Sequence, residues 1–207
     1  MPDYDLDRAY DLKGTEDVQR LYGDWATTYD ESFGQAWGYV APRKIAEIFR
    51  AETTEGAEPI LDLGAGTGLV AENLGGLTVD ALDLSPEMLR IAKGKGLYRT
   101  LIEADATKTL PMGDASYGGV ISCGTFTHGH VGPECLPELL RIARPGALFC
   151  CGTIPAVLDG AGFGSALARL VAAGLIEPVR FREIAIYEGA DHDHAQDRGL
   201  VMVFRRL

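Results

Sequence analysis

The chain has 207 residues, of which 46% are hydrophobic and 24% charged, as expected for one globular domain. Its formal net charge of −11 at pH 7 repels a polyanion, and since no basic stripe offsets that charge, we expect no nucleic-acid partner. No apolar run approaches the roughly 18 residues of a membrane span, and the first residues lack the basic start and apolar core of a secretory signal, which predicts a cytoplasmic protein without a membrane partner.

The first predicted elements are two amphipathic helices, in which apolar and aromatic side chains recur at helical spacing. In the first helix these side chains are Val18, Leu21, Tyr22, Trp25, Ala26 and Tyr29, and in the second they are Ala41, Ile45, Ile48 and Phe49. We therefore predict a helical extension or lid over residues 1–58 and a core over residues 59–207, within a single domain.

From Pro59 onward, apolar runs alternate with helical patterns, which is typical of βαβ units on a parallel sheet. The expected strands cover residues 60–64, 78–84, 98–103, 119–123, 147–152, 179–187 and 200–205. The segment between the last two strands is polar and too short for a crossover helix, so these strands should form an antiparallel hairpin. The predicted fold class is α/β, with a seven-stranded, mostly parallel sheet, helices on both faces and an antiparallel C-terminal hairpin.

The first strand leads directly into the motif Gly64-x-Gly66-x-Gly68. Glycine tolerates positive φ and has no Cβ, so the strand can turn sharply and a ligand can lie on the backbone near the start of the next helix. In the G-x-G-x-x-G motif of dinucleotide-binding folds, the third glycine would fall on Leu69. The motif therefore predicts a nucleotide-like ligand at the carboxyl end of this strand.

Asp83 ends the second strand, where one carboxylate can accept hydrogen bonds from both hydroxyls of a ribose. The alternative role for Asp83 is a favourable charge at a helix N-terminus. That helix begins at Ser85-Pro86-Glu87, with the serine as N-cap and the proline at the first helical position. Asp80 lies in the middle of the strand and is expected to serve packing or solubility.

The residue types that bind metals do not form a recognisable metal motif. Cys123, Cys135, Cys150 and Cys151 show no C-x-x-C spacing, which predicts buried free thiols. The side chains of Asp191-His192-Asp193-His194 can all bind a metal, but alternate residues of an extended segment point in opposite directions, so we expect a solvated loop there. No metal site is predicted.

Several segments together resemble the class I S-adenosylmethionine-dependent methyltransferases over roughly residues 15–207. More narrowly, they are similar to the methyltransferase-like group named after the Williams-Beuren syndrome chromosome region. The resemblance implies a Rossmann-like fold and S-adenosylmethionine as cofactor, and it leaves the methyl acceptor open. The segments are Trp25-Ala-x-x-Tyr-Asp, Leu61-Asp-Leu-Gly-Ala-Gly-Thr-Gly-Leu, Leu82-Asp-Leu-Ser-Pro-Glu-Met-Leu, Lys95-Gly-Leu-Tyr and Cys123-Gly-Thr-Phe-Thr-His-Gly-His.

The resemblance also implies roles for individual residues. The glycine turn would cradle the methionine part of the cofactor with support from Asp62, and Asp83 would bind the ribose. Asp105 would accept from the adenine amino group, with a role as a turn residue as the alternative. Met88 would pack on the adenine ring or serve the core, and Cys123 would form a wall of the pocket. The full implied set is Tyr29, Asp62, Gly64, Ala65, Gly66, Asp83, Leu84, Met88, Asp105, Ala106 and Cys123.

In this class of enzymes, methyl acceptors approach the end of the fourth strand, here Ser122–His130. This segment has neither the Asn/Asp-Pro-Pro-Tyr/Phe signature of nucleobase amino methyltransferases nor the Pro-Cys of cytosine C5 enzymes. A small-molecule acceptor is therefore expected. If the methylated group is a hydroxyl, His128 or His130 could accept its proton, with an orienting or structural role as the alternative.

Two other functions remain open from the sequence. A nicotinamide-dependent oxidoreductase would also have a glycine turn and an acid at the next strand end, but it does not account for Leu69 or for the terminal hairpin. A non-catalytic S-adenosylmethionine-binding protein would use the same pocket. The oligomeric state is not predicted.

Overall fold

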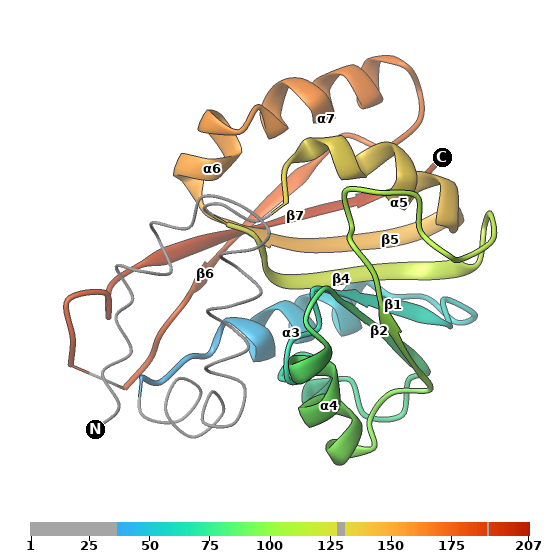
Figure 1. The fold of residues 1–207 in the computed structure, drawn as a ribbon. Helices are drawn as coiled ribbons and strands as arrows, with labels where there is room; N and C mark the ends of the chain where they lie inside the picture. The colour runs from blue at the N-terminus through green and yellow to red at the C-terminus, as the bar shows by residue number, and fades with distance from the viewer. Residues whose placement is uncertain (1–36, 128–130, 190) are drawn as a thin grey trace.

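The computed structural model describes residues 37–127, 131–189 and 191–207. Its centre is a seven-stranded sheet in the order β3-β2-β1-β4-β5-β7-β6 (Figure 1). Strand β7 runs antiparallel to both β5 and β6, and the other neighbouring strands are parallel. The strands are β1 (Ile60–Leu63), β2 (Val79–Asp83), β3 (Thr100–Glu103), β4 (Tyr117–Phe126), β5 (Ala143–Thr153), β6 (Arg180–Ala185) and β7 (Arg198–Arg205). The predicted fold class, including the terminal hairpin, is confirmed.

Helices cover both faces of the sheet. Figure 1 shows α5, α6 and α7 on one side of the strands and α3 and α4 on the other. The α-helices are α3 (Ala41–Glu52), α4 (Pro86–Lys95), α5 (Leu136–Ile142), α6 (Pro155–Gly160) and α7 (Phe163–Ala172), and the short 3-10 helices are η2 (Ala71–Asn73) and η3 (Pro133–Cys135). Helix α4 begins as predicted, because the Ser85 hydroxyl accepts a hydrogen bond from the Met88 amide at 3.2 Å.

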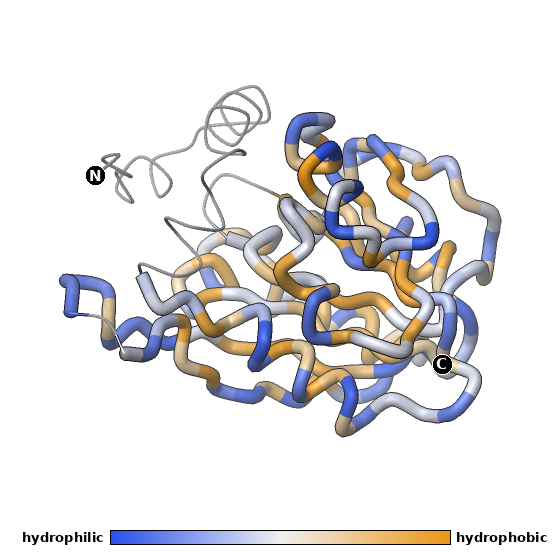
Figure 2. Tube along the Cα trace, turned by 90° about the horizontal axis from the view of Figure 1, so that it is seen from below, coloured by the Kyte–Doolittle hydropathy of each residue, from blue (hydrophilic) through white to orange (hydrophobic). Residues whose placement is uncertain are grey.

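The core explains why the central strands read as continuous apolar runs. Successive side chains of a strand point to opposite faces, and here both faces are covered by helices. On β1, Leu61 and Leu63 pack into the cluster formed with α5, α6 and α7, whereas Ile60 packs into the cluster formed with α3. Hydrophobic residues accordingly follow the segments that cross the middle of the molecule, and hydrophilic residues lie on the outer loops (Figure 2).

Two local predictions differ from the structure. The glycine turn is followed by the three-residue 3-10 helix η2 instead of a longer helix. The helix is short because Gly75 and Gly76 follow it closely, and glycine disfavours continuation of a helix before β2 begins. The helical pattern of apolar residues over 136–143 predicts a helix that Pro145-Gly146 would end. Helix α5 instead ends at Ile142, and Pro145-Gly146 lie within the first part of β5.

Helix α3 belongs to the packed core even though the sequence places it in the N-terminal extension. Ile45, Ala46 and Phe49 are buried against β4 and β5. Its helical pattern is therefore that of a core helix. The first amphipathic helix, predicted over residues 18–29, lies outside the described residues.

Asp80 has a structural role on β2. Its side chain is 2% exposed and accepts hydrogen bonds from Arg99 at 2.6 and 2.9 Å and from the Tyr117 hydroxyl at 2.9 Å. Burial alone would raise the pKa of Asp80, but the hydrogen bonds from Arg99 and Tyr117 outweigh burial and hold this pKa below its usual range. Of the two expected roles, packing is confirmed and solubility is wrong, because the carboxylate lies inside the protein.

We predict that Arg99→Met lowers the free energy of unfolding by about 2 kcal/mol, because it leaves the buried Asp80 carboxylate without its cation. The predicted loss of stability is smaller than for a fully buried ion pair, because half of the Arg99 side chain is exposed. Arg182→Met is the matched control, since this exposed arginine meets Glu52 only at 3.6 Å and should cost less than about 0.5 kcal/mol. Urea unfolding measures both, and equal effects would contradict the prediction.

Candidate functional site

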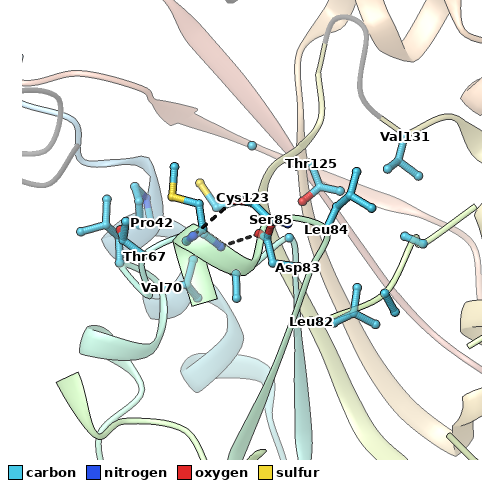
Figure 3. Close-up of a pocket in the computed structure, with 18 of the residues that line it drawn as sticks. Pro42, Thr67, Val70, Leu82, Asp83, Leu84, Ser85, Cys123, Thr125 and Val131 are labelled. Atoms are coloured by element: carbon cyan, nitrogen blue, oxygen red, sulfur yellow. Dashed lines mark hydrogen bonds between the residues drawn. The ribbon is translucent and has the colours of Figure 1, made fainter. Parts of the chain in front are cut away.

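A pocket opens at the carboxyl ends of four neighbouring strands, where ligands bind in open α/β sheets. Its walls come from Gly64–Thr67 after β1, Asp83–Ser85 after β2, Ala104–Thr107 after β3 and Cys123–Thr125 near the end of β4. Figure 3 shows Asp83 and Ser85 at the start of α4, with Cys123 and Thr125 extending from β4. Tyr39 and Pro42 close one side.

The glycine turn is held tightly against β4. Gly64 has φ of +66°, and a Cβ added there would lie 2.0 Å from Thr125 Oγ1, so only glycine fits. The carbonyl oxygen of Leu63 accepts hydrogen bonds from the hydroxyls of Ser122 at 2.7 Å and Thr125 at 2.8 Å. A Cβ added to Gly66, by contrast, would meet no atom within 4 Å. The first glycine is thus required by packing, and the second leaves the turn open to the pocket.

Asp83 connects the turn to the next strand. Its carboxylate accepts hydrogen bonds from the Gly66 amide at 2.7 Å and from the Ser85 amide at 2.9 Å. Burial raises the pKa of Asp83 above its usual range, and the backbone hydrogen bonds from Ser85 and Gly66 oppose that rise. A carboxylate has about four lone-pair sites, so Asp83 retains acceptor capacity for a ligand.

Asp105 and Met88 line the pocket from two other sides. Asp105 Oδ1 accepts from the Thr107 amide at 2.8 Å and from its hydroxyl at 2.7 Å. The residue therefore stabilises a turn and also lines the pocket. Met88 is 2% exposed and is the apolar surface that α4 offers to the pocket.

Cys123 forms a wall of the pocket, and its sulfur lies 3.2 Å from the Tyr39 hydroxyl. Burial raises the pKa of the Cys123 thiol to about 12. The group is therefore a neutral thiol at physiological pH and a poor nucleophile. This agrees with the expectation that Cys123 does not attack a substrate.

Asp62 lies beneath the turn and is fully buried. Its Oδ2 accepts a hydrogen bond from the Tyr98 hydroxyl at 2.7 Å, while its Oδ1 has no hydrogen-bond partner among the described residues. Burial raises the pKa of Asp62 to about 7, with a smaller contribution from the nearby Asp83 carboxylate. An unsatisfied buried carboxylate oxygen next to a pocket is a common mark of a ligand site.

The structure brings nine of the predicted cofactor-binding residues together around one pocket. They are Gly64, Ala65, Gly66, Asp83, Leu84, Met88, Asp105, Ala106 and Cys123. Asp62 is the exception, because it supports the turn from behind and does not line the cavity. Tyr29, His128 and His130 lie outside the described residues.

Sequence patterns do not mark several residues of the site, among them Tyr39, Thr125 and Tyr98. Thr125 and Tyr98 occur only within longer motifs, and the predicted strand over residues 98–103 includes Tyr98 although β3 begins at Thr100. Tyr39 and Thr125 contact the site from a distant segment and from the neighbouring strand, so no local pattern marks them. Tyr98 reaches Asp62 because it lies in the loop before β3.

The two histidines of the terminal hairpin lie in different surroundings. The His192 ring packs 4.7 Å from that of Trp37 and 4.9 Å from that of Tyr187, and its Nε2 lies 3.2 Å from the Trp37 carbonyl oxygen. His194 Nδ1 lies 3.0 Å from the Asp197 carboxylate. His192 is thus part of an aromatic cluster and differs from the solvated loop residue that was expected.

Comparisons with known proteins identify the domain. Residues 61–151 match the family model described as "Methyltransferase domain". The chain carries a class I methyltransferase domain. The domain is similar to methyltransferase-like protein 27 of Homo sapiens, with 33% identity over 140 residues that cover 64% of this chain and 56% of that protein. This match agrees with the narrower resemblance stated from the sequence.

The methyltransferase domain is also similar to a demethylmenaquinone methyltransferase of Beutenbergia cavernae, with 32% identity over 68% of this chain and 59% of that protein. A solved SAM-dependent methyltransferase from Thermotoga maritima shares the fold, with a TM-score of 0.63 and 16% identity over 91% of this chain and 99% of that chain. The chain spans less than two thirds of the length of these two curated relatives. Together the matches imply S-adenosylmethionine as the cofactor of the domain.

No helix in the described parts of the methyltransferase domain is long and apolar enough to cross a membrane.

We predict that Gly64→Ala lowers the free energy of unfolding by about 3 kcal/mol, because the new Cβ would overlap Thr125 Oγ1 and L residues are strained at positive φ. Gly66→Ala is the control, since it carries similar strain at φ of +54° but meets no atom, and should cost about 1 kcal/mol. Chemical denaturation distinguishes them. A Gly64→Ala protein as stable as Gly66→Ala would show that the contact with Thr125 does not constrain the turn.

Proposed function

We propose that this protein transfers a methyl group from S-adenosylmethionine to a small-molecule acceptor. The observation that carries the proposal is the charge around the glycine turn. The carboxylates of Asp62 and Asp83 lie next to the turn, and none of the described residues that line the pocket is basic. S-adenosylmethionine carries a sulfonium and an ammonium cation, whereas the pyrophosphate of a nicotinamide dinucleotide is an anion. A pocket with this charge favours the cationic ligand.

The shape of the turn supports the same choice. Dinucleotide-binding folds place the pyrophosphate on the N-terminus of the helix that follows the glycine turn. Here that helix is the three-residue η2, which offers little helix dipole. The Asp62 carboxylate beneath the turn accepts only from the neutral Tyr98 hydroxyl among the described residues, so its charge favours a cationic ligand in the pocket. The residues present therefore fit the cofactor that the comparisons imply.

In this proposal the described residues bind and orient the cofactor. Asp83 would accept hydrogen bonds from the ribose hydroxyls, Asp105 would accept from the adenine amino group, and Met88 would contact the adenine ring. The turn at Gly64 and Gly66 would hold the methionine part. When bound, S-adenosylmethionine supplies an activated methyl group, so alignment and exclusion of water are the main tasks of the protein.

The acceptor would enter beside Cys123 and Gly124, where Tyr39, Pro42 and Val131 also line the pocket. These side chains are apolar or neutral, which favours an uncharged small molecule over a phosphorylated one. One of the relatives is named for its action on demethylmenaquinone, which is a small molecule. Tyr29 is proposed as a further cofactor contact, and a cytoplasmic location without nucleic-acid or membrane partners remains part of the proposal.

Thermal unfolding with S-adenosylmethionine, S-adenosylhomocysteine and NAD in parallel tests the cofactor. The first two ligands should raise the melting temperature, because a ligand at about 100 times its Kd adds roughly 2.7 kcal/mol of stability. Asp83→Asn should weaken S-adenosylmethionine binding at least about tenfold in calorimetry, since it removes a charged acceptor. Glu103→Gln is the control, because Glu103 ends the neighbouring strand opposite Asp83 but is exposed and is not among the residues that line the pocket. Stabilisation by NAD alone would reject the proposal.

A second prediction concerns proton transfer. If the methylated group is a hydroxyl, its proton leaves as the new O–CH3 bond forms, and the imidazole of His128 or His130 would accept it. The double variant His128→Ala/His130→Ala should then lower kcat by about 100-fold with an identified hydroxyl acceptor, without changing the Kd for S-adenosylhomocysteine. Full turnover in the double variant would exclude both histidines as the general base.

A further inference from the structure

The buried carboxylate of Asp62 is held by a single described donor. Asp62 lies on the same face of β1 as Ile60, the face that α3 covers, and is 0% exposed. Its Oδ2 accepts from the Tyr98 hydroxyl at 2.7 Å, and its Oδ1 has no described partner. The position and charge of this carboxylate therefore depend on Tyr98.

Tyr98 is fixed in turn by packing. A Cβ added to Gly68 would lie 3.1 Å from the Tyr98 ring, and the ring also packs against the cluster that contains Ala65 and Leu89. Burial and the neighbouring Asp62 carboxylate raise the pKa of Tyr98 far above its usual range. The phenol consequently stays protonated and acts as a permanent donor.

A comparison within the molecule shows what this arrangement achieves. Asp80, one strand away, also accepts from a buried tyrosine hydroxyl, that of Tyr117, but the Arg99 cation neutralises it. Asp62 receives a neutral donor alone. A hydrogen bond from a phenol stabilises the carboxylate without cancelling its charge. The Asp80 carboxylate is therefore neutralised within the fold, whereas the Asp62 carboxylate, once ionised, carries an uncompensated negative charge beneath the pocket.

We propose that Tyr98 is a positioning residue of the cofactor site, whose hydroxyl favours the ionised form of Asp62 and orients its carboxylate beneath the glycine turn, so that the charge of Asp62 attracts the cationic cofactor. The proposal rests on the proposed function and deepens it. It makes the affinity for the cofactor dependent on pH, because protonation of Asp62 removes the attraction.

The charged and titratable groups that face this pair come from several elements. Asp83 at the end of β2 and the thiol of Cys123 on β4 lie near Asp62. The negative charge of Glu72 on η2 contributes to the raised pKa of Tyr98, and Glu72 forms an ion pair with Lys95 of α4 at 2.5 Å. Asp83 adds to the negative charge around Asp62 and disfavours its ionisation. The hydrogen bond from Tyr98 is the contact that opposes this effect and the cost of burial.

The direction of the pH dependence follows from the raised pKa of Asp62, about 7. In the ligand-free protein, Asp62 takes up a proton more readily than in the unfolded chain, so its contribution to stability is present at low pH and is lost as pH rises through this value. Cofactor affinity changes in the opposite sense, because the carboxylate that attracts the cofactor forms as pH rises. Affinity should therefore increase between about pH 6 and pH 8.

The test compares Tyr98→Phe with Tyr117→Phe by calorimetric titration of S-adenosylmethionine and S-adenosylhomocysteine from pH 5.5 to 8.5. Both variants remove one hydroxyl that donates to a buried aspartate, but only Tyr98 donates to the aspartate beneath the glycine turn. Tyr98→Phe should weaken binding at pH 7 about tenfold and move the midpoint of the pH profile upward by about one unit. Tyr117→Phe should leave the Kd and the midpoint as in the wild type.

The outcomes separate the two proposals. If the wild type binds neither compound at any pH, the proposed function fails. If the wild type binds but Tyr98→Phe has the same Kd and the same midpoint, the positioning role is wrong while the function stands. If Tyr98→Phe does not fold, Asp62→Asn tests the same pair, because it removes the group whose titration would make cofactor binding depend on pH. The pH dependence should then disappear, and its persistence would refute the role of the pair.

Discussion

The carbonyl oxygen of Leu63 is where the sheet and the pocket meet. It accepts hydrogen bonds from the hydroxyls of Ser122 and Thr125 on β4, at 2.7 and 2.8 Å. These bonds fix the last residue of β1 against the neighbouring strand, and they place Thr125 Oγ1 where any side chain on Gly64 would collide with it. The chain must therefore turn at a glycine, and the pocket opens over that turn. Asp83 then ties the turn to β2 through the Gly66 amide.

The charge beneath this turn is costly for the ligand-free protein. Burying a carboxylate without a cation is unfavourable, and the raised pKa of Asp62 is a direct expression of that cost. Asp80 avoids the same cost because Arg99 accompanies it. Proteins keep such unpaired buried charges mainly where a ligand can compensate them. Burial of a carboxylate without a cation thus both destabilises the ligand-free protein and favours the binding of a cationic ligand.

The side of the pocket near Cys123 depends on contacts between distant parts of the chain. Val40 donates to the Ile186 carbonyl oxygen at 2.9 Å, and Glu188 donates to that of Gly38 at 2.8 Å. These bonds hold the segment before α3 against the terminal hairpin, with His192 packed on Trp37. Tyr39 is thereby placed with its hydroxyl at Cys123. The antiparallel hairpin, which distinguishes this sheet from a fully parallel one, thus helps to build the pocket.

The sequence by itself determined the fold class, the seven strands, the start of α4 and the ends of strands at which Gly64, Asp83 and Asp105 lie, because these features follow from local periodicity, glycine spacing and capping residues. Only the tertiary structure decided what the buried polar groups do. Asp62 and Asp80 lie on neighbouring strands and have the same chemistry, yet one has Tyr98 alone and the other has Arg99 and Tyr117. Those partners come from loops and strands distant in sequence, and a pattern of nearby residues does not encode which of them meet.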